Sequence, residues 1–139
     1  MANLKTSRRR SFEDQCARCT YCAALMWLDH PEEFAARFGV RPRAVRNFMA
    51  TAEHLTARSD GGGNDPRNIE AACWTCNHRR HARKGHSPTL HQYRSRVRKL
   101  NARGTWHPSW AYDVGIASRH QPSPMHALMP HASAVGEVT

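Results

Sequence analysis

Cysteine spacing is the feature that most constrains how this 139-residue chain can fold. All five cysteines stand in Cys-x-x-Cys spacings, at Cys16, Cys19, Cys22, Cys73 and Cys76. Four thiolates in a tetrahedral arrangement form a common structural zinc site, and two such pairs roughly fifty residues apart are typical of one. The site would combine Cys73 and Cys76 with either Cys16 and Cys19 or Cys19 and Cys22. One of the five thiols is then a spare or an alternative ligand.

Composition favours metal-bound thiolates over disulfides. Hydrophobic residues make up 40% of the chain and aromatic residues 8%, which is thin for a large core. A small core usually needs a staple such as a metal ion. The sequence shows no apolar N-terminal run typical of a signal peptide and no apolar stretch of membrane-spanning length. We therefore expect a cytoplasmic protein with reduced cysteines and no membrane association.

Net charge points to a polyanionic partner. Lys and Arg outnumber Asp and Glu by 21 to 11, a formal charge of +10, and such a balance suits nucleic acid. No acidic residue occurs between Glu70 and Asp113. The basic side chains predicted to contact phosphates from this part of the chain are Arg79, Arg80, Arg83, Lys84, Arg94 and Arg98.

In the first part of the chain, a flexible arm and a later helical insert are predicted. Residues 1–11 are polar and basic, and we expect a flexible arm there. Within a domain spanning residues 12–85, residues 25–50 are predicted to form a helical insert. Pro31 followed by two acids marks a helix start, and apolar spacing predicts two short amphipathic helices around Gly39. These two helices form either a packing unit or a DNA-reading helix-turn-helix.

A hairpin is predicted in the middle of the chain. Residues 50–56 form its first strand, and alternation places Glu53 and His54 on opposite faces of that strand. Residues 59–68 contain three consecutive glycines and predict a turn-rich loop. A short return strand is expected at residues 69–72.

Two helices are predicted after this hairpin. The first opens at Cys76 or Asn77 and runs through Arg83. The second lies in a basic helical extension at residues 86–113 and begins with Ser87 as N-cap, followed by Pro at the first helical position. Its apolar face consists of Leu90, Tyr93, Val97 and Leu100.

The end of the chain carries fewer signals. Trp106 and Trp110 are expected to pack the second helix against the domain. Residues 114–139 are poor in large apolar side chains and rich in Pro, Ser and His, so we expect a disordered tail.

The order of short motifs in residues 16–85 is more specific than any one of them. The motifs are Cys19-Thr20-Tyr21-Cys22, Glu53-His54, Gly61-Gly62, Asn68-Ile69 and Cys73-Trp74-Thr75-Cys76-Asn77. This order resembles that of the HNH endonucleases, a branch of the ββα-metal nucleases. The resemblance implies an α+β fold, in which a small ββα-metal (HNH) core is stapled by a four-cysteine zinc site and has additional helices before and after it. The Cys-x-Tyr-Cys form is family-like, which favours Cys19 and Cys22 as the early zinc ligands.

The resemblance also implies a role for each polar motif residue. His54 would be the general base that activates water, and Glu53 and Asn77 would be oxygen ligands of a catalytic Mg²⁺ or Mn²⁺. Glu53 stands where many relatives carry Asp, and Asn77 where many carry His. Asn77 and His81 share a helix face, so His81 is a third candidate ligand or a phosphate contact. Asn68 would brace the loop through backbone hydrogen bonds and thereby orient His54.

The function implied is hydrolysis of phosphodiester bonds in double-stranded DNA, leaving 5′-phosphate and 3′-hydroxyl ends. The setting implied is bacterial or phage-encoded. Two alternatives stay open at this point. One is a non-catalytic, zinc-containing DNA-binding module whose basic helices are the function. The other is an accessory subunit of a phage packaging or restriction system that acts with a protein partner.

Overall fold

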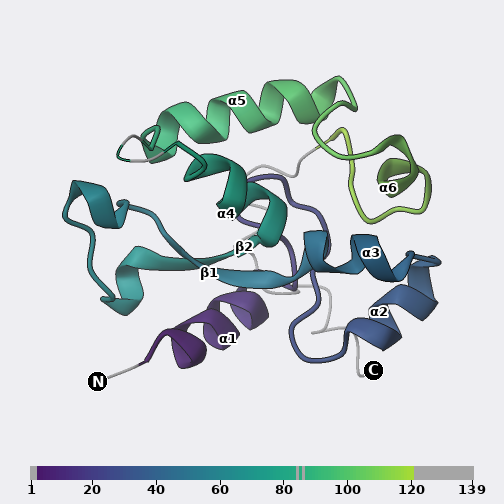
Figure 1. Cartoon of the computed structure of the whole chain (residues 1–139), viewed down its shortest axis with the longest axis horizontal. Helices are drawn as coiled ribbons and strands as arrows, with labels where there is room; N and C mark the ends of the chain where they lie inside the picture. The colour runs from purple at the N-terminus through teal and green to yellow at the C-terminus, as the bar shows by residue number, and fades with distance from the viewer. Residues whose placement is uncertain (1–2, 84, 86, 121–139) are drawn as a thin grey trace, which may run out of the picture.

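The centre of the molecule is a two-stranded antiparallel hairpin, seen in a computed structural model that describes residues 3–83, 85 and 87–120. Strand β1 (Ala50–His54) pairs with β2 (Ile69–Cys73), with Ala50 opposite Cys73 and Glu53 opposite Glu70. Helix α4 (Trp74–Arg80) follows β2 directly (Figure 1). The predicted order of strand, loop, strand and helix is therefore confirmed, and the fold class is α+β.

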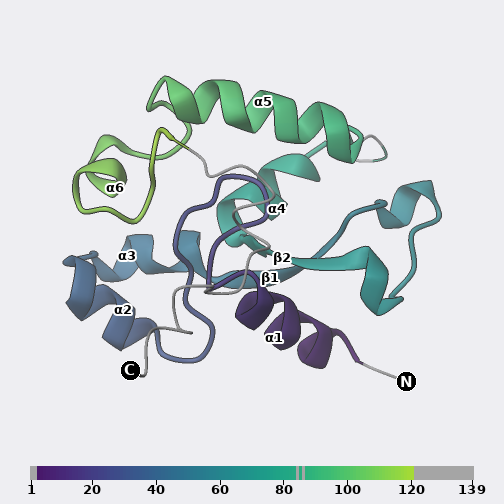
Figure 2. The same cartoon turned by 180° about the vertical axis from the view of Figure 1, so that it is seen from behind.

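Helices surround this hairpin on both sides. The remaining helices are α1 (Leu4–Asp14), α2 (Pro31–Phe38), α3 (Pro42–Val45), α5 (Leu90–Ala102) and α6 (Ser109–Asp113), and the 3₁₀ turns are η1 (Arg46–Phe48), η2 (Arg58–Asp60) and η3 (Pro66–Asn68). Helix α1 lies on one side of the hairpin, and α4 and α5 lie on the other (Figures 1 and 2). The core joins α5 to the hairpin, since Tyr93 of α5 and Ala71 of β2 belong to one buried cluster, and Phe12 of α1 packs against it.

Local signals in the helical insert were sufficient to predict its structure. Pro31 is the first residue of α2, and two acids follow it in the first turn. Helix α2 ends before Gly39, whose φ of 66° is left-handed and suits glycine. Helix α3 follows after Arg41. The two short helices around Gly39 are confirmed.

Helix α4 begins and ends earlier than the sequence predicts. It starts at Trp74 rather than at Cys76 or Asn77, because the Cys73 sulfur sits at the N-cap and accepts a hydrogen bond from the backbone N–H of Cys76 at 3.4 Å. A cysteine is not a usual cap residue, so the earlier start carries no standard signal. The helix ends at Arg80 rather than Arg83.

Helix α5 also has a different cap from the predicted one. Thr89 is the N-cap and forms a capping box with Gln92, so Ser87 is not the cap. The predicted apolar face is confirmed, because Tyr93 and Val97 are buried and the flanking Leu90 and Leu100 pack against the core.

The prediction of a flexible N-terminal arm is wrong for residues 4–11, which form most of α1. Polar side chains hold this helix in place. Asn3 caps it by accepting a hydrogen bond from the Thr6 N–H at 2.9 Å, and the Ser11 hydroxyl donates to the Ile69 carbonyl at 3.0 Å. Because part of this docking uses polar side chains, the polar composition of the segment does not reveal it.

The next residues continue this docking on the sheet edge. The Gln15 amide donates to the Ala71 carbonyl at 2.8 Å and accepts from the Ala71 N–H at 2.9 Å. One side chain thus takes the place of a third strand at the edge of β2.

The prediction of a disordered tail is wrong at its beginning. Ile116 and Ala117 are buried, and the Ile116 carbonyl accepts a hydrogen bond from the Leu25 N–H at 3.0 Å. One large apolar side chain in an otherwise polar segment is enough to anchor it against the core. Residues 121–139, which carry the rest of that prediction, lie outside the described residues.

Candidate active site and four-cysteine cluster

Four of the five cysteines gather in one buried cluster, as predicted. The sulfur atoms of Cys19, Cys22, Cys73 and Cys76 all lie within 4.8 Å of one another, and none of these residues is more than 3% exposed. The Sγ atoms of Cys22 and Cys73 are 3.9 Å apart. Tetrahedral zinc with bonds of about 2.3 Å requires sulfur–sulfur distances of about 3.8 Å, so the donor set could hold zinc. The remaining cysteine, Cys16, is exposed and lies outside the cluster.

The groups around the cluster also suit metal-bound thiolates. Burial raises the pKa of the Cys22 and Cys76 thiols, so a cation is needed to keep both deprotonated. The Trp106 indole N–H donates to the Cys76 sulfur at 3.2 Å. Burial also lowers the pKa of His107 to about 4, and its Nε2 lies 3.2 Å from the Cys22 sulfur. A neutral His107 can donate one N–H to that sulfur.

A second site is a cavity of about 310 Å³ at the end of the hairpin. Four residues with predicted catalytic or ligand roles border it: Glu53, His54, Asn77 and His81. Glu53 and His54 come from the end of β1, Asn77 from α4, and His81 from the C-cap of α4. The alternation along β1 holds, since Glu53 is buried and His54 is partly exposed, and both residues border the cavity.

Glu53 is 1% exposed and makes contacts on both carboxylate oxygens. Its Oε1 lies 2.9 Å from Nε2 of His81, and its Oε2 accepts a hydrogen bond from the Tyr21 hydroxyl at 3.0 Å. Two adjacent ligands of an octahedral ion with bonds of about 2.1 Å are separated by about 3.0 Å. Oε1 and the imidazole are therefore spaced to share one cation. The Nδ1 atom of His81 lies 2.7 Å from the Ser87 hydroxyl, which can fix the ring orientation.

Asn77 presents its amide to the same cavity. Its Nδ2 donates to the Thr51 hydroxyl at 3.0 Å and to the Ala52 carbonyl at 3.4 Å. Across residues 3–83, 85 and 87–120, the hydrogen bonds of this side chain all use Nδ2. The amide oxygen is thus the atom that a hard cation could use.

Two residues to which the sequence motifs assign no role lie beside the His54 ring. Its Nε2 lies 2.9 Å from the Asn64 Oδ1 atom and 3.3 Å from Nε of Arg58. Both residues belong to the loop between β1 and β2, where Asn and Arg are ordinary turn residues. No sequence signal distinguishes them, because the loop conformation alone brings them to the imidazole.

Asn68 braces this loop with three hydrogen bonds. Its amide accepts from the Thr56 N–H at 2.8 Å and donates to the Thr56 carbonyl at 3.1 Å and the Gly63 carbonyl at 2.9 Å. The loop is also tight at Gly62, where a Cβ atom would overlap with the carbonyl of Thr56. The Gly-rich stretch and the middle Asn of the motif therefore have a structural use beside the site.

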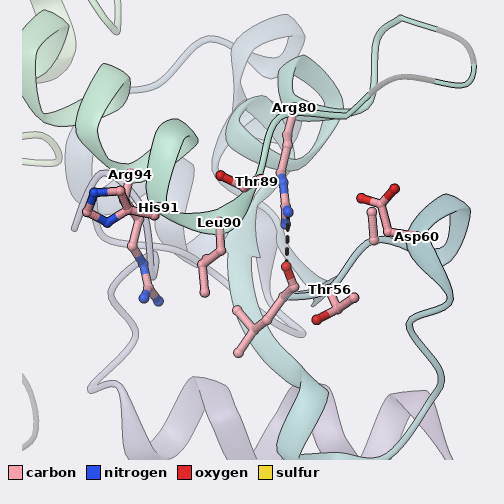
Figure 3. Close-up of a pocket in the computed structure, with 9 residues that line it drawn as sticks. Thr56, Asp60, Arg80, Thr89, Leu90, His91 and Arg94 are labelled. Atoms are coloured by element: carbon pink, nitrogen blue, oxygen red, sulfur yellow. Dashed lines mark hydrogen bonds between the residues drawn. The ribbon is translucent and has the colours of Figure 1, made fainter.

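Arg80 does not face solvent, so its predicted phosphate contact is corrected. It is 2% exposed, and its guanidinium donates to the Tyr21 hydroxyl and to the carbonyls of His54, Leu55 and Pro88. All five of its N–H groups are used in this way. Figure 3 shows Arg80 beside a second cavity of about 430 Å³, with its hydrogen bond to the loop after β1. Arg80 joins the loop after β1, through Leu55, to the segment before α5, through Pro88. It is therefore a structural residue.

The other basic residues predicted to contact phosphates differ in exposure and in the partners that they already have. Arg83 and Arg98 are exposed, and Arg83 borders the 310 Å³ cavity. Arg94 is ion-paired with Glu70 at 3.1 Å, and Arg79 donates to the Trp106 carbonyl at 2.7 Å. Lys84 lies outside the described residues.

The hairpin, the helix that follows it and the four buried cysteines are consistent with the ββα-metal class of fold. A family model described as HNH endonuclease matches residues 44–83, which include β1, the loop, β2 and α4. This segment is therefore similar to the HNH endonucleases, and the four-cysteine cluster is consistent with the variety that carries zinc.

The family match supports a nuclease or DNA-binding role, with nucleic acid as the partner. Neither a search of curated proteins nor a search of solved structures gives a match. In the described part of the chain, no helix has the length and apolar character needed to cross a membrane.

Proposed function

We propose that this protein is a metal-dependent HNH endonuclease that hydrolyses phosphodiester bonds in DNA. The observation that carries the proposal is the 310 Å³ cavity, which combines one imidazole, His54, with a carboxylate, an amide and a second imidazole. Hydrolysis at a phosphate needs a base to activate water and a positive charge to stabilise the transition state. Both can be supplied from the walls of this one cavity.

His54 is the general base in this proposal. An amide oxygen can only accept a hydrogen bond, so the 2.9 Å contact with Asn64 favours the tautomer protonated at Nε2. Arg58 cannot donate to the same nitrogen in that tautomer, and its Nη2 instead lies 3.3 Å from the Asn64 oxygen. The Nδ1 atom of His54 then keeps its lone pair and can take a proton from water.

Glu53, Asn77 and His81 would hold Mg²⁺ or Mn²⁺. A divalent ion bound there would neutralise charge on the phosphoryl oxygens and stabilise the leaving 3′-oxygen. Ser87 would keep the His81 proton on Nδ1, so that Nε2 is available as a ligand. The four cysteines would hold zinc in a purely structural role, and the products would carry 5′-phosphate and 3′-hydroxyl ends.

The distribution of exposed cationic groups supports a nucleic-acid substrate, which we propose to be double-stranded DNA. Arg58 and Arg83 are exposed and border the catalytic cavity. The exposed basic side chains of α5 and the residue after it are Arg96, Arg98, Lys99 and Arg103. Together they offer a phosphate-binding surface beside the site, and binding through it should weaken steeply with salt.

A second candidate function is a non-catalytic DNA-binding module. One observation favours it: both oxygens of Glu53 already have protein partners, so a cation must compete with His81 for Oε1. In that case DNA binding would persist without any cleavage. An accessory role beside a protein partner would give the same result until the partner is added.

Nicking of supercoiled plasmid DNA tests the proposal. With Mg²⁺ or Mn²⁺ we expect the wild type to nick the plasmid, and with excess EDTA we expect no nicking. His54→Ala should lower the rate by about 10²–10⁴-fold, because it removes the base. His30→Ala is the matched control, since His30 follows another acid and is exposed away from the cavity.

Folding and DNA binding must be measured on the same samples. His54→Ala should keep the thermal midpoint, the zinc content and the DNA affinity of the wild type. Cleavage at the wild-type rate by His54→Ala would refute the base assignment. DNA binding by the wild type without metal-dependent nicking would favour the binding module instead.

A further inference from the structure

Tyr21 connects the two metal-binding regions of the molecule. It lies between Cys19 and Cys22 in the first pair of the cluster, and it is 3% exposed. Its hydroxyl extends away from the sulfurs and donates to Oε2 of Glu53 at 3.0 Å. The same oxygen of Tyr21 accepts a hydrogen bond from Nη1 of Arg80 at 2.8 Å. A side chain of the cysteine cluster thus touches the predicted ligand of the other site.

The two oxygens of Glu53 face different surroundings because of these contacts. Oε2 points to the interior, where the Tyr21 hydroxyl bonds to it and Arg80 lies 3.6 Å away. Oε1 points to the cavity, where His81 lies 2.9 Å away. The carboxylate of a flexible Glu side chain can rotate. A partner that holds one oxygen is therefore needed to keep Oε2 in the interior and Oε1 in the cavity.

We propose that Tyr21 is a positioning residue for Glu53, and that its hydroxyl keeps Oε1 directed at the cavity where the cation binds. The inference rests on the proposed function, because it assumes that Glu53 is a ligand. Without the hydroxyl, Oε2 would keep only the Arg80 guanidinium as an interior partner. The carboxylate could then turn both oxygens towards that buried cation and withdraw Oε1 from the cavity.

The ring of Tyr21 has a separate, structural task. It packs edge-on against Tyr93, with centroids 4.8 Å apart and an interplanar angle of 88°. Phenylalanine keeps this ring and its packing and removes only the hydroxyl. The substitution Tyr21→Phe therefore separates the positioning role from the core role.

The test is a Mn²⁺ titration of the zinc-loaded protein, followed by electron paramagnetic resonance of free Mn²⁺. We expect Tyr21→Phe to weaken Mn²⁺ binding about tenfold while the zinc content stays at the wild-type value. Tyr112→Phe is the matched control, because it removes a hydroxyl that donates to Asn101 at 2.8 Å, away from Glu53. The control should bind Mn²⁺ as the wild type does.

Kinetics give a second readout of the same variants. In the nicking assay, Tyr21→Phe should need more Mn²⁺ for half-maximal rate while the rate at saturating Mn²⁺ stays within about twofold of the wild type. A Mn²⁺ affinity of Tyr21→Phe within twofold of the wild type overturns the inference and leaves the proposed function intact. Absence of Mn²⁺ binding by the wild type overturns both.

A crystal structure of the wild type with Mn²⁺ covers the case in which Tyr21→Phe fails to fold. We expect Oε1 of Glu53 on the ion and Oε2 still bonded to Tyr21. A structure in which Oε2 binds the ion, or in which the Tyr21 contact is lost, overturns the inference.

Discussion

The four-cysteine cluster and the 310 Å³ cavity differ in how completely the fold closes them. Every cluster residue is at most 3% exposed, and its sulfurs come from two segments that contact each other directly. Of the four candidate site residues in the cavity, Glu53 is buried, whereas His54, Asn77 and His81 remain partly open to solvent. A structural metal site is closed, while a catalytic site keeps room for substrate and water. The comparison therefore predicts that the cluster governs stability and that the cavity governs activity.

The largest effect should come from the cluster itself. Cys73→Ser should abolish cooperative thermal unfolding, because zinc binding and folding are coupled in small domains. The measurements are circular dichroism during heating and zinc content by mass spectrometry. Cys16→Ser is the control and should unfold as the wild type does, because Cys16 lies outside the cluster. Equal stability of the two variants would remove the basis for a structural zinc.

Substitution of Arg80 should have the second largest effect. Comparison with an exposed arginine separates the effect of burial from the effect of charge. Arg80→Met leaves the buried Glu53 without its cation and several carbonyls without donors, so we expect a loss of about 3–5 kcal/mol in unfolding free energy. Urea denaturation measures it. The control Arg98→Met removes the same charge from an exposed position, and it should weaken DNA binding with little change in stability. The reverse pattern would contradict the assignment of Arg80 as structural.

Substitution of Asn68 should have an intermediate effect, and it should lower both stability and activity. Asn68→Ala removes three hydrogen bonds within the loop, and we expect a loss of about 1–2 kcal/mol. Because the loop carries Asn64, the nicking rate should fall as well. Urea denaturation and plasmid nicking on one preparation would check this, and normal activity of the variant would exclude a role of the brace in orienting His54.

Asn64 should have the smallest effect on stability and a clear effect on chemistry. Asn64→Ala should change the unfolding free energy by no more than about 0.5 kcal/mol, because the residue is exposed. We expect the nicking rate to fall several-fold, since the Nε2 proton of His54 loses its acceptor. Ring ¹⁵N chemical shifts of His54 report the tautomer directly. An unchanged tautomer in Asn64→Ala would show that another group selects it.

Short-range patterns predicted the parts of the site that are close in sequence or share one motif. Glu53 and His54 are neighbours on β1, and Asn77 and His81 lie one helical turn apart, so their convergence needed only the hairpin and the helix. The motif predicts hydrogen bonds from Asn68 to the loop backbone, and the structure confirms them. The roles of these residues in catalysis stay predictions.

Contacts between distant polar side chains were not predictable. Gln15 and Ala71 are far apart in sequence, and the Gln15 side chain bonds to the Ala71 backbone. Hydrophobic periodicity along the sequence therefore does not indicate this contact. Arg80 belongs to a basic run that, from the sequence, is expected to be exposed. Its burial depends on the carbonyls of His54, Leu55 and Pro88 and on the Tyr21 hydroxyl, which come from three other segments and meet at one point.

The sequence by itself determined the cysteine cluster, the strand–loop–strand–helix order and the helix α2 between Pro31 and Gly39. Each of these follows from ligand chemistry or from backbone preferences that act over a few residues. Only the tertiary structure decided that Arg80 is buried, that Tyr21 reaches Glu53 and that α1 docks on the sheet edge. The physical reason is that a polar group can be buried only where partners from elsewhere in the chain satisfy its hydrogen bonds, and local sequence does not specify those partners.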